Sequence, residues 1–299
     1  MSTDKKRELS LLRRLFAVTG CLLVAALVAG CGSDTGKRPL STSITQAAAE
    51  APDGQVSITI PGTLAADFAV LEQSEKSELG LAIMPVGGDQ LVGLGDWTTG
   101  PAWSTMKVPL VMAAERKNPG GQTYATSAAI TASDNSAADS LWSSLGTPRE
   151  AALSVQAVLR EGGDNATVVQ EKPSRSEYSS FGQSEWSLAD QVRFASKLPC
   201  IPGSDKVVDL MGSVSANQQW GLGSVFEAAE FKGGWGPNAD GAYLVRQFGL
   251  VPANGGAVAI ALAAQPDSGT FSDGMNLLDE MAGLIERHLG EFTGGSCPA

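Results

Sequence analysis

Histidine is nearly absent: the chain of 299 residues has one, His288, near its C-terminus. A hydroxyl nucleophile needs a base that takes its proton, so a Ser-His-Asp arrangement has little material here. One histidine and dispersed cysteines also form no recognisable metal-ligand spacing. The sequence therefore predicts no metal site and no cofactor, and a nucleophilic serine would need another base.

Cysteine is also scarce, with four in the chain. Cys21 and Cys31 lie within the first 31 residues, which leaves Cys200 and Cys297 for the rest. An oxidising extracytoplasmic compartment would favour a disulfide between these two. The alternative is two separate thiols, because the sequence does not give the distance between them.

The N-terminal 30 residues have the pattern of a targeting segment. Five basic residues precede an apolar run that ends at Gly30 and is short for a membrane span, which disfavours the alternative of a transmembrane anchor. The run closes with Val28-Ala29-Gly30-Cys31 and resembles a bacterial lipoprotein signal peptide. This resemblance implies cleavage before Cys31, a lipid such as palmitate on that cysteine, and a membrane-anchored domain on the extracytoplasmic face.

Positive charge is sparse in the remaining chain. Five of the 21 Lys and Arg and two of the 32 Asp and Glu lie in residues 1–30, so the rest has a net charge of −14. Such an acidic chain argues against nucleic acid as a partner and against broad binding to anionic lipid.

The rest of the chain is expected to form a tether and one domain. Residues 31–53 are rich in Ser, Thr, Gly and Ala and read as a flexible tether, followed by a domain over 54–299. The pattern predicts an α+β fold, with an antiparallel sheet from about 54–105 and 215–299, flanked by terminal helices, and an inserted helical region at about 106–214. The expected strands are 55–60, 79–86, 90–94, 228–231, 242–251 and 257–263, and the expected helices include 64–73, 136–145, 148–160, 187–198 and 272–289.

Ser104 and Lys107 are the first candidate site residues. Their spacing places both side chains on one face of a helix, and Pro109 predicts that this helix begins close to Ser104. Free amides at a helix start can stabilise an oxyanion. The alternatives are a capping serine and a lysine whose stem lies along the core. The four-residue match is weak alone, since Ser2 to Lys5 repeats it in the targeting segment.

Two later motifs follow in order. Ser133-Asp134-Asn135 precedes a predicted helix, where capping is the simpler explanation. Lys232-Gly233-Gly234-Trp235 follows a predicted strand, where the two glycines allow close approach of another chain or a ligand. The alternative for Lys232 is a charged residue before a hairpin turn.

The three motifs in this order resemble those of the penicillin-binding serine enzymes, the serine β-lactamases and D-Ala-D-Ala peptidases, over residues 54–290. The resemblance implies a β-lactamase/transpeptidase-like fold with a shortened helical region. It implies that Ser104 is acylated, that Lys107 takes its proton with help from Lys232, and that Ser133 relays a proton to the leaving group. It also implies substrate contacts through Asn135, Lys232 and Gly234, and an oxyanion hole from the amides of Ser104 and Trp235.

Three departures from this family stand out. Gly233 takes the place of a hydroxyl residue that would bind a substrate carboxylate, and the separation of Ser104 from Ser133 is short. For deacylation, the loop at 168–184 offers Glu171 and Glu177, with Glu171 at the more plausible distance before Ser187. No amide stands four residues after Glu171, where the chain has Arg175, so a solvated loop charge is the competing interpretation.

The resemblance implies a lipid-anchored, monomeric serine hydrolase that faces the cell wall and acts on a small molecule or a peptidoglycan fragment. Its compact size favours a β-lactamase over a D,D-peptidase. The alternatives are a non-catalytic protein that binds cell-wall fragments or a partner protein, and a hydrolase of small esters.

Overall fold

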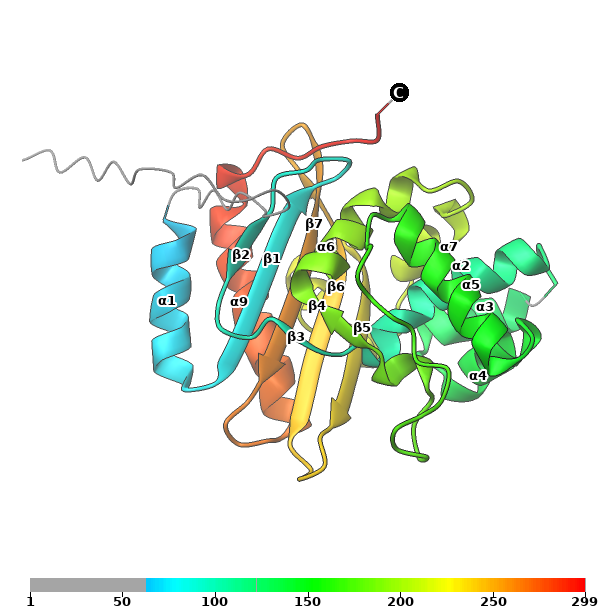
Figure 1. The fold of residues 1–299 in the computed structure, drawn as a ribbon. Coiled ribbons are helices and arrows are strands. Elements are labelled where there is room, and N and C mark those ends of the chain that lie inside the picture. Colours follow the sequence, from blue (N-terminus) through cyan, green and yellow to red (C-terminus); the bar gives the residue numbers. More distant parts are fainter. Residues whose placement is uncertain (1–62, 122, 299) are drawn as a thin grey trace, which may run out of the picture. The chain divides into compact units, whose positions relative to one another are not determined.

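A computed structural model describes residues 63–121 and 123–298. The predicted signal peptide, the lipidation site Cys31, the tether and the strand expected at 55–60 lie outside the described residues. The described residues form five- and two-stranded sheets with helices against them, which confirms the α+β prediction (Figure 1).

The five-stranded sheet is antiparallel throughout, in the order β2-β1-β7-β6-β5. Alternate residues of β1 enter different cores, with Leu81 and Ile83 in one and Ala82 and Met84 in the other. Both faces are therefore apolar, as expected for strands covered on both sides. The strands are β1 (Glu78–Pro85), β2 (Val92–Leu94), β5 (Glu230–Pro237), β6 (Tyr243–Ala253) and β7 (Gly256–Gln265).

The two terminal helices cover one face of this sheet, as Figure 1 shows for α1 (Leu64–Glu75) and α9 (Phe271–His288). The other face carries the helical region. There α6 packs directly on β1 and β7, while α2 is buried among α3, α4 and α5. The helices of this region are α2 (Lys107–Lys117), α3 (Thr123–Thr131), α4 (Asn135–Ser144), α5 (Pro148–Glu161), α6 (Leu188–Lys197) and α7 (Asp205–Met211).

Two features around the motifs differ from the sequence prediction. The strand expected to end at Phe231 runs on through the third motif to Pro237, because its glycines let neighbouring elements approach. The helix expected near Ser104 starts later: Trp103–Met106 form the 3₁₀ turn η1, and α2 begins at Lys107. A two-stranded sheet of β3 (Thr99–Pro101) and β4 (Glu185–Ser187) was not expected.

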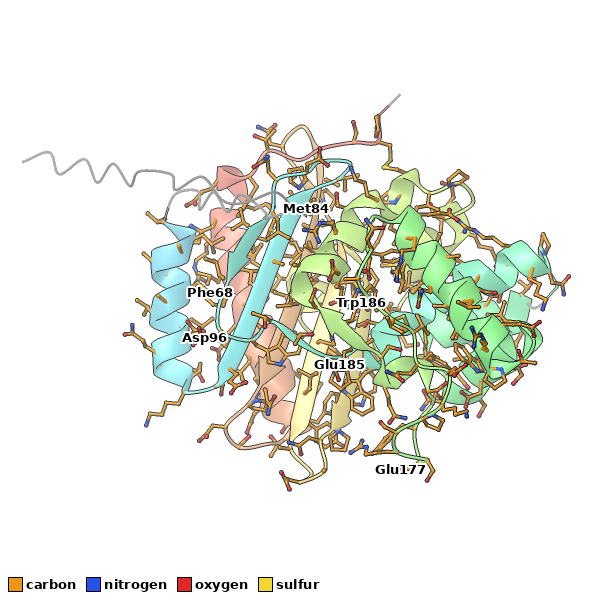
Figure 2. The ribbon with its side chains drawn as sticks, in the orientation of Figure 1. Phe68, Met84, Asp96, Glu177, Glu185 and Trp186 are labelled. Atoms are coloured by element: carbon orange, nitrogen blue, oxygen red, sulfur yellow. A yellow bond between two sulfur atoms is a disulfide. The ribbon has the colours of Figure 1, made fainter. Side chains whose placement is uncertain are left out.

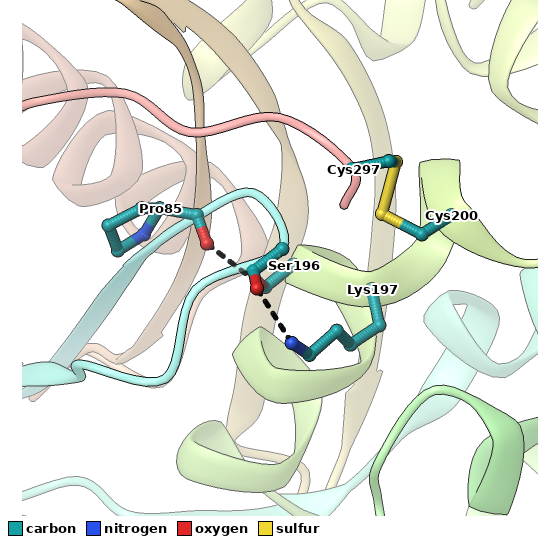
Figure 3. Close-up of a disulfide and its surroundings, with 6 residues drawn as sticks. Pro85, Ser196, Lys197, Cys200 and Cys297 are labelled. Carbon is teal, nitrogen blue, oxygen red and sulfur yellow. Dashed lines mark hydrogen bonds between the residues drawn. A yellow bond between two sulfur atoms is a disulfide. The ribbon is translucent and has the colours of Figure 1, made fainter. Parts of the chain in front are cut away.

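The predicted disulfide is present between Cys200 and Cys297, whose Cα atoms are 5.3 Å apart (Figure 3). Cys200 ends the short turn η3 (Leu198–Cys200) after α6, so the bond ties the C-terminal segment to the helical side of the sheet. Close by, the Ser196 hydroxyl of α6 donates to the Pro85 carbonyl of β1 at 2.7 Å.

Within residues 63–121 and 123–298, no helix has both the length and the apolar character needed to cross a membrane.

Candidate active site

Ser104 lies in η1, between β3 and the buried helix α2. The residue before it, Trp103, has a φ of 49°, a left-handed conformation that is unusual for a bulky side chain. Such backbone strain is concentrated at functional sites. Ser104 opens on a pocket of about 390 Å³, whose walls come from η1, α4, the loop before η2 (Phe181–Gln183) and β5.

Lys107 is the first residue of α2 and is only 1 % exposed. Its Nζ donates to the Ser133 carbonyl at 2.5 Å, to Asn135 Oδ1 at 2.7 Å and to Ser133 Oγ at 3.3 Å. Burial lowers the pKa of Lys107 from 10.5 to about 8, although Asp139 and Asp134 act in the opposite direction. A neutral amine that can accept a proton is therefore accessible near neutral pH.

Ser133 lies between two lysine nitrogens. Its Oγ accepts from Lys232 Nζ at 2.8 Å in addition to Lys107, and its φ of 55° is again left-handed. The capping function that competes for this motif belongs to Asp134, whose carboxylate accepts from the Ala137 amide at 2.8 Å. Capping therefore does not occupy Ser133 or Asn135, and both line the pocket despite their short separation from Ser104 in the sequence.

Lys232 is fully buried on β5. Its Nζ donates to Ser133 Oγ and to the Gly233 carbonyl at 2.9 Å. Burial, followed by repulsion from Lys107, lowers the pKa of Lys232 well below its usual 10.5. Among the described residues, no carboxylate hydrogen-bonds to Lys232. Its environment therefore favours a neutral amine over an ion-paired ammonium group.

The glycines of β5 let η1 pack against the strand. A Cβ on Gly234 would lie 2.9 Å from the amide nitrogens of both Ser104 and Thr105. The backbone of Gly234 therefore adjoins the Ser104 amide, and the next residue, Trp235, lines the same pocket. This arrangement places the two amides of the predicted oxyanion hole on neighbouring elements.

Of the two loop carboxylates, Glu177 lines the Ser104 pocket and Glu171 does not, which corrects the choice of Glu171. Glu171 is exposed and does not line the pocket, whereas Glu177 does, from the far part of the loop in Figure 2. The reason is Gln183, whose amide donates to the carbonyls of Arg175 at 3.0 Å and Tyr178 at 2.9 Å. These bonds fold 175–179 back onto the pocket and leave the start of the loop outside.

Glu177 is not held firmly. Its side chain is 60 % exposed, and its Oε1 lies 3.8 Å from Arg175 Nε. Four residues further on, the buried Phe181 lines the pocket instead of an amide side chain. The Glu177 carboxylate thus lines the pocket without an amide neighbour at position 181 that would orient a water molecule.

Sequence reasoning missed the remaining walls of the pocket. Asp139 stands four residues after Asn135 on α4, so helical spacing from the second motif would have found it. The aromatic walls Tyr178 and Tyr243 carry no local motif, because they come from a loop and from β6 and meet only in the folded chain.

His288 lies on the other face of the sheet, where its ring nitrogens contact Asp67 and Glu291. Among the described residues, no cluster of three or more His, Cys, Asp or Glu side chains has the arrangement of a metal site.

Solved structures of serine β-lactamases have the same fold as this chain. The TLA-3 extended-spectrum β-lactamase is similar with a TM-score of 0.63 and 14 % identity, over 76 % of this chain and 98 % of that one. A class A β-lactamase from Mycobacterium abscessus has a TM-score of 0.62 and 17 % identity, over 76 % and 99 %. A β-lactamase from Streptosporangium roseum gives 0.60 and 14 %, over 77 % and 99 %. No protein-family model and no curated protein matches the sequence. The resemblance noted in the motifs is therefore confirmed at the level of the fold, which is that of the serine β-lactamases.

Proposed function

We propose that the protein is a serine hydrolase that forms an acyl-enzyme on Ser104. The observation that carries this proposal is the convergence of Ser104, Lys107 and Ser133 on one pocket, with Lys232 behind it. A buried amine with a lowered pKa beside a hydroxyl is the combination that activates a serine without histidine.

In the proposed reaction, the proton of Ser104 moves through the neighbouring residues as follows. Ser104 Oγ bonds to the carbonyl carbon of an ester or amide while its proton passes to the neutral Lys107 amine. The amides of Ser104 and Trp235 stabilise the oxyanion. Ser133 then passes its proton to the leaving oxygen or nitrogen as that bond breaks, and is reprotonated from Lys107 through their 3.3 Å contact.

Water completes the cycle by attacking the acyl-enzyme. Glu177 is the carboxylate that we assign to this step, since it lines the pocket and Glu171 does not. Because Glu177 is exposed and lacks a partner that would orient water, deacylation should be the slow step. β-Lactams and D-Ala-D-Ala peptides are the first substrates to test, as the reactions associated with the resemblance.

The location proposed for this enzyme is the extracytoplasmic face of a bacterial membrane, with Cys31 as the lipid anchor. The Cys200–Cys297 disulfide supports an oxidising compartment. Metabolic labelling with a fatty-acid probe, compared between the full chain and Cys31→Ala, tests the anchor. Equal labelling of the two proteins would exclude lipidation at Cys31.

A fluorophosphonate probe tests the nucleophile, because it phosphonylates activated serines without needing a particular substrate. Labelling should be lost in Ser104→Ala and in Lys107→Met, which keeps the volume of the buried side chain. Lys117→Ala, an exposed lysine at the end of the same helix, is the matched control and should label normally. Unchanged labelling of Ser104→Ala would reject the proposal.

One observation favours a second candidate, a non-catalytic binding protein for cell-wall fragments or a partner protein. All three donor positions of a charged Lys107 have acceptors on Ser133 and Asn135, and among the described residues neither lysine nor any other group hydrogen-bonds to the Ser104 hydroxyl. Absence of labelling in the wild type, with the fold intact, would establish this candidate instead.

A further inference from the structure

The charged groups that line the Ser104 pocket should determine which acyl donors it accepts. This inference rests on the hydrolase function proposed for the pocket. Neither nearby lysine presents its charge outward. Lys232 is fully buried and is not part of the pocket lining, and Lys107 directs its Nζ at Ser133 and Asn135. A carboxylate on a ligand would find no free ammonium among these groups.

The position of Gly233 removes a second means of binding an anion. A Cβ on Gly233 would lie 2.6 Å from the ring of Trp220, so no hydroxyl side chain fits there. The Trp220 ring is held in place by edge contacts with Trp235 at 6.0 Å and with Phe271 at 6.3 Å between centroids. The indole therefore excludes from position 233 the hydroxyl side chain that, by the family resemblance, would bind a substrate carboxylate.

Apart from Lys107, whose Nζ is held by Ser133 and Asn135, the charged side chains that line the pocket are negative. Asp139 and Glu177 are its carboxylates, and Asp139 is oriented by the Ser179 hydroxyl, which donates to it at 2.6 Å. The half-buried Arg175 lines a neighbouring cavity, with its guanidinium carbon 4.3 Å from the centre of the Tyr178 ring. Arg175 offsets part of the charge of Glu177. Asp139 forms no salt bridge among the described residues, although its charge raises the pKa of Lys107.

Aromatic rings form a further part of the pocket surface. Trp103, Tyr178, Trp235 and Tyr243 line the pocket, and their π-faces attract cations. Arg175 already uses one face of Tyr178 in this way. Carboxylates beside aromatic faces are a typical environment for a substituted ammonium group.

We propose that this pocket selects acyl donors without a negative charge, and that it prefers a cationic acyl donor, such as one carrying an ammonium group, over anions of the same shape. Penicillins, which carry a free carboxylate, would then acylate Ser104 slowly compared with neutral or cationic esters.

Binding to Ser104→Ala tests the selection separately from turnover. Three anilides of matched shape are compared by tryptophan fluorescence and calorimetry, ending in a trimethylammonium, a tert-butyl or a carboxylate group. The cationic ligand should bind about tenfold more tightly than the anionic one, with the neutral ligand between them. Equal or tighter binding of the anion, or no binding of the cation at millimolar concentration, would overturn the proposal.

Variants locate the source of the preference. In the same Ser104→Ala background, we expect Asp139→Asn and Glu177→Gln each to reduce the ratio of cationic to anionic ligand affinity about two- to threefold. Glu171→Gln removes an equal charge from the same loop outside the pocket and should leave the ratio unchanged. If the affinity ratio falls equally in all three variants, the preference comes from the net charge of the protein and not from contacts in the pocket, which would overturn the proposal. Fluorophosphonate labelling of the wild type decides the proposed hydrolase independently of these ratios.

Discussion

The two faces of the central sheet hold buried nitrogen bases in opposite ways. On the helical side, Lys107 and Lys232 contact only neutral oxygens, and burial lowers the pKa of both. On the side of α9, His288 lies between the carboxylates of Asp67 and Glu291, which raise its pKa. Burying the two lysines costs stability and makes their protons easier to remove. The ion pairs of His288 instead join the helices that carry the charged groups.

The largest effect expected is on the helical side. Replacing Lys107 by Met should slow fluorophosphonate labelling of Ser104 by about 10²- to 10⁴-fold, because the base is removed. Lys117→Ala should keep the wild-type rate. If Lys107→Met labels at the wild-type rate, the amine is not the base and the contrast between the two faces has no catalytic meaning.

The disulfide tests whether the C-terminal segment needs its link to the helical side. Cys200→Ser/Cys297→Ser should lose about 2–5 kcal/mol of unfolding free energy, since a long loop of the unfolded chain is released. The labelling rate under native conditions should stay close to that of the wild type, because neither cysteine lines the pocket. Urea denaturation measures the first quantity; a large fall in labelling without unfolding would contradict the second.

The motifs could be predicted because they are local. Ser104 to Lys107 and Ser133 to Asn135 are short spacings whose position at the start of a helix follows from Pro109 and from the capping residues. The three-residue strands β3 and β4 could not be predicted, since their pairing joins residues more than 80 positions apart. Position 233 requires glycine because a side chain there would overlap the Trp220 ring, which no local pattern in the sequence indicates. Glu177 likewise reaches the pocket only because Gln183 folds the loop.

That explanation of Gly233 leads to a test on the α9 side of the sheet, where Trp220 packs. Gly233→Thr should destabilise the protein by about 1–3 kcal/mol, because its Cβ would overlap the Trp220 ring. Adding Trp220→Ala relieves the overlap, so the double variant should be more stable than the sum of the two single losses predicts. Chemical denaturation of the four proteins measures this coupling, and strict additivity would show that the ring is not what excludes a side chain.

The lowered pKa of Lys107 also predicts how labelling depends on pH. The neutral amine is the active form, so the labelling rate of Ser104 should rise with pH and level off above about 8. Lys107→Met should lose this rise. A wild-type rate that is flat between neutral pH and pH 9 would mean that another group, or none, controls the step.

The smallest effect is expected on the opposite face, from His288→Gln. The folded-state pKa of His288 is raised above 6.5, chiefly by the hydrogen bond to Glu291 and further by Asp67. Its charged contacts therefore stabilise the protein fully below the unfolded-state pKa, and this stabilisation is lost as the pH rises through the folded-state value. The difference in unfolding free energy between wild type and variant should be larger near pH 6 than near pH 9, as measured by urea denaturation at both pH values. Labelling of Ser104 should be unchanged, because His288 lies across the sheet from the pocket. If the difference in unfolding free energy does not depend on pH, His288 contributes only packing between α1 and α9. In that case only the face with the two lysines has buried bases whose protonation matters.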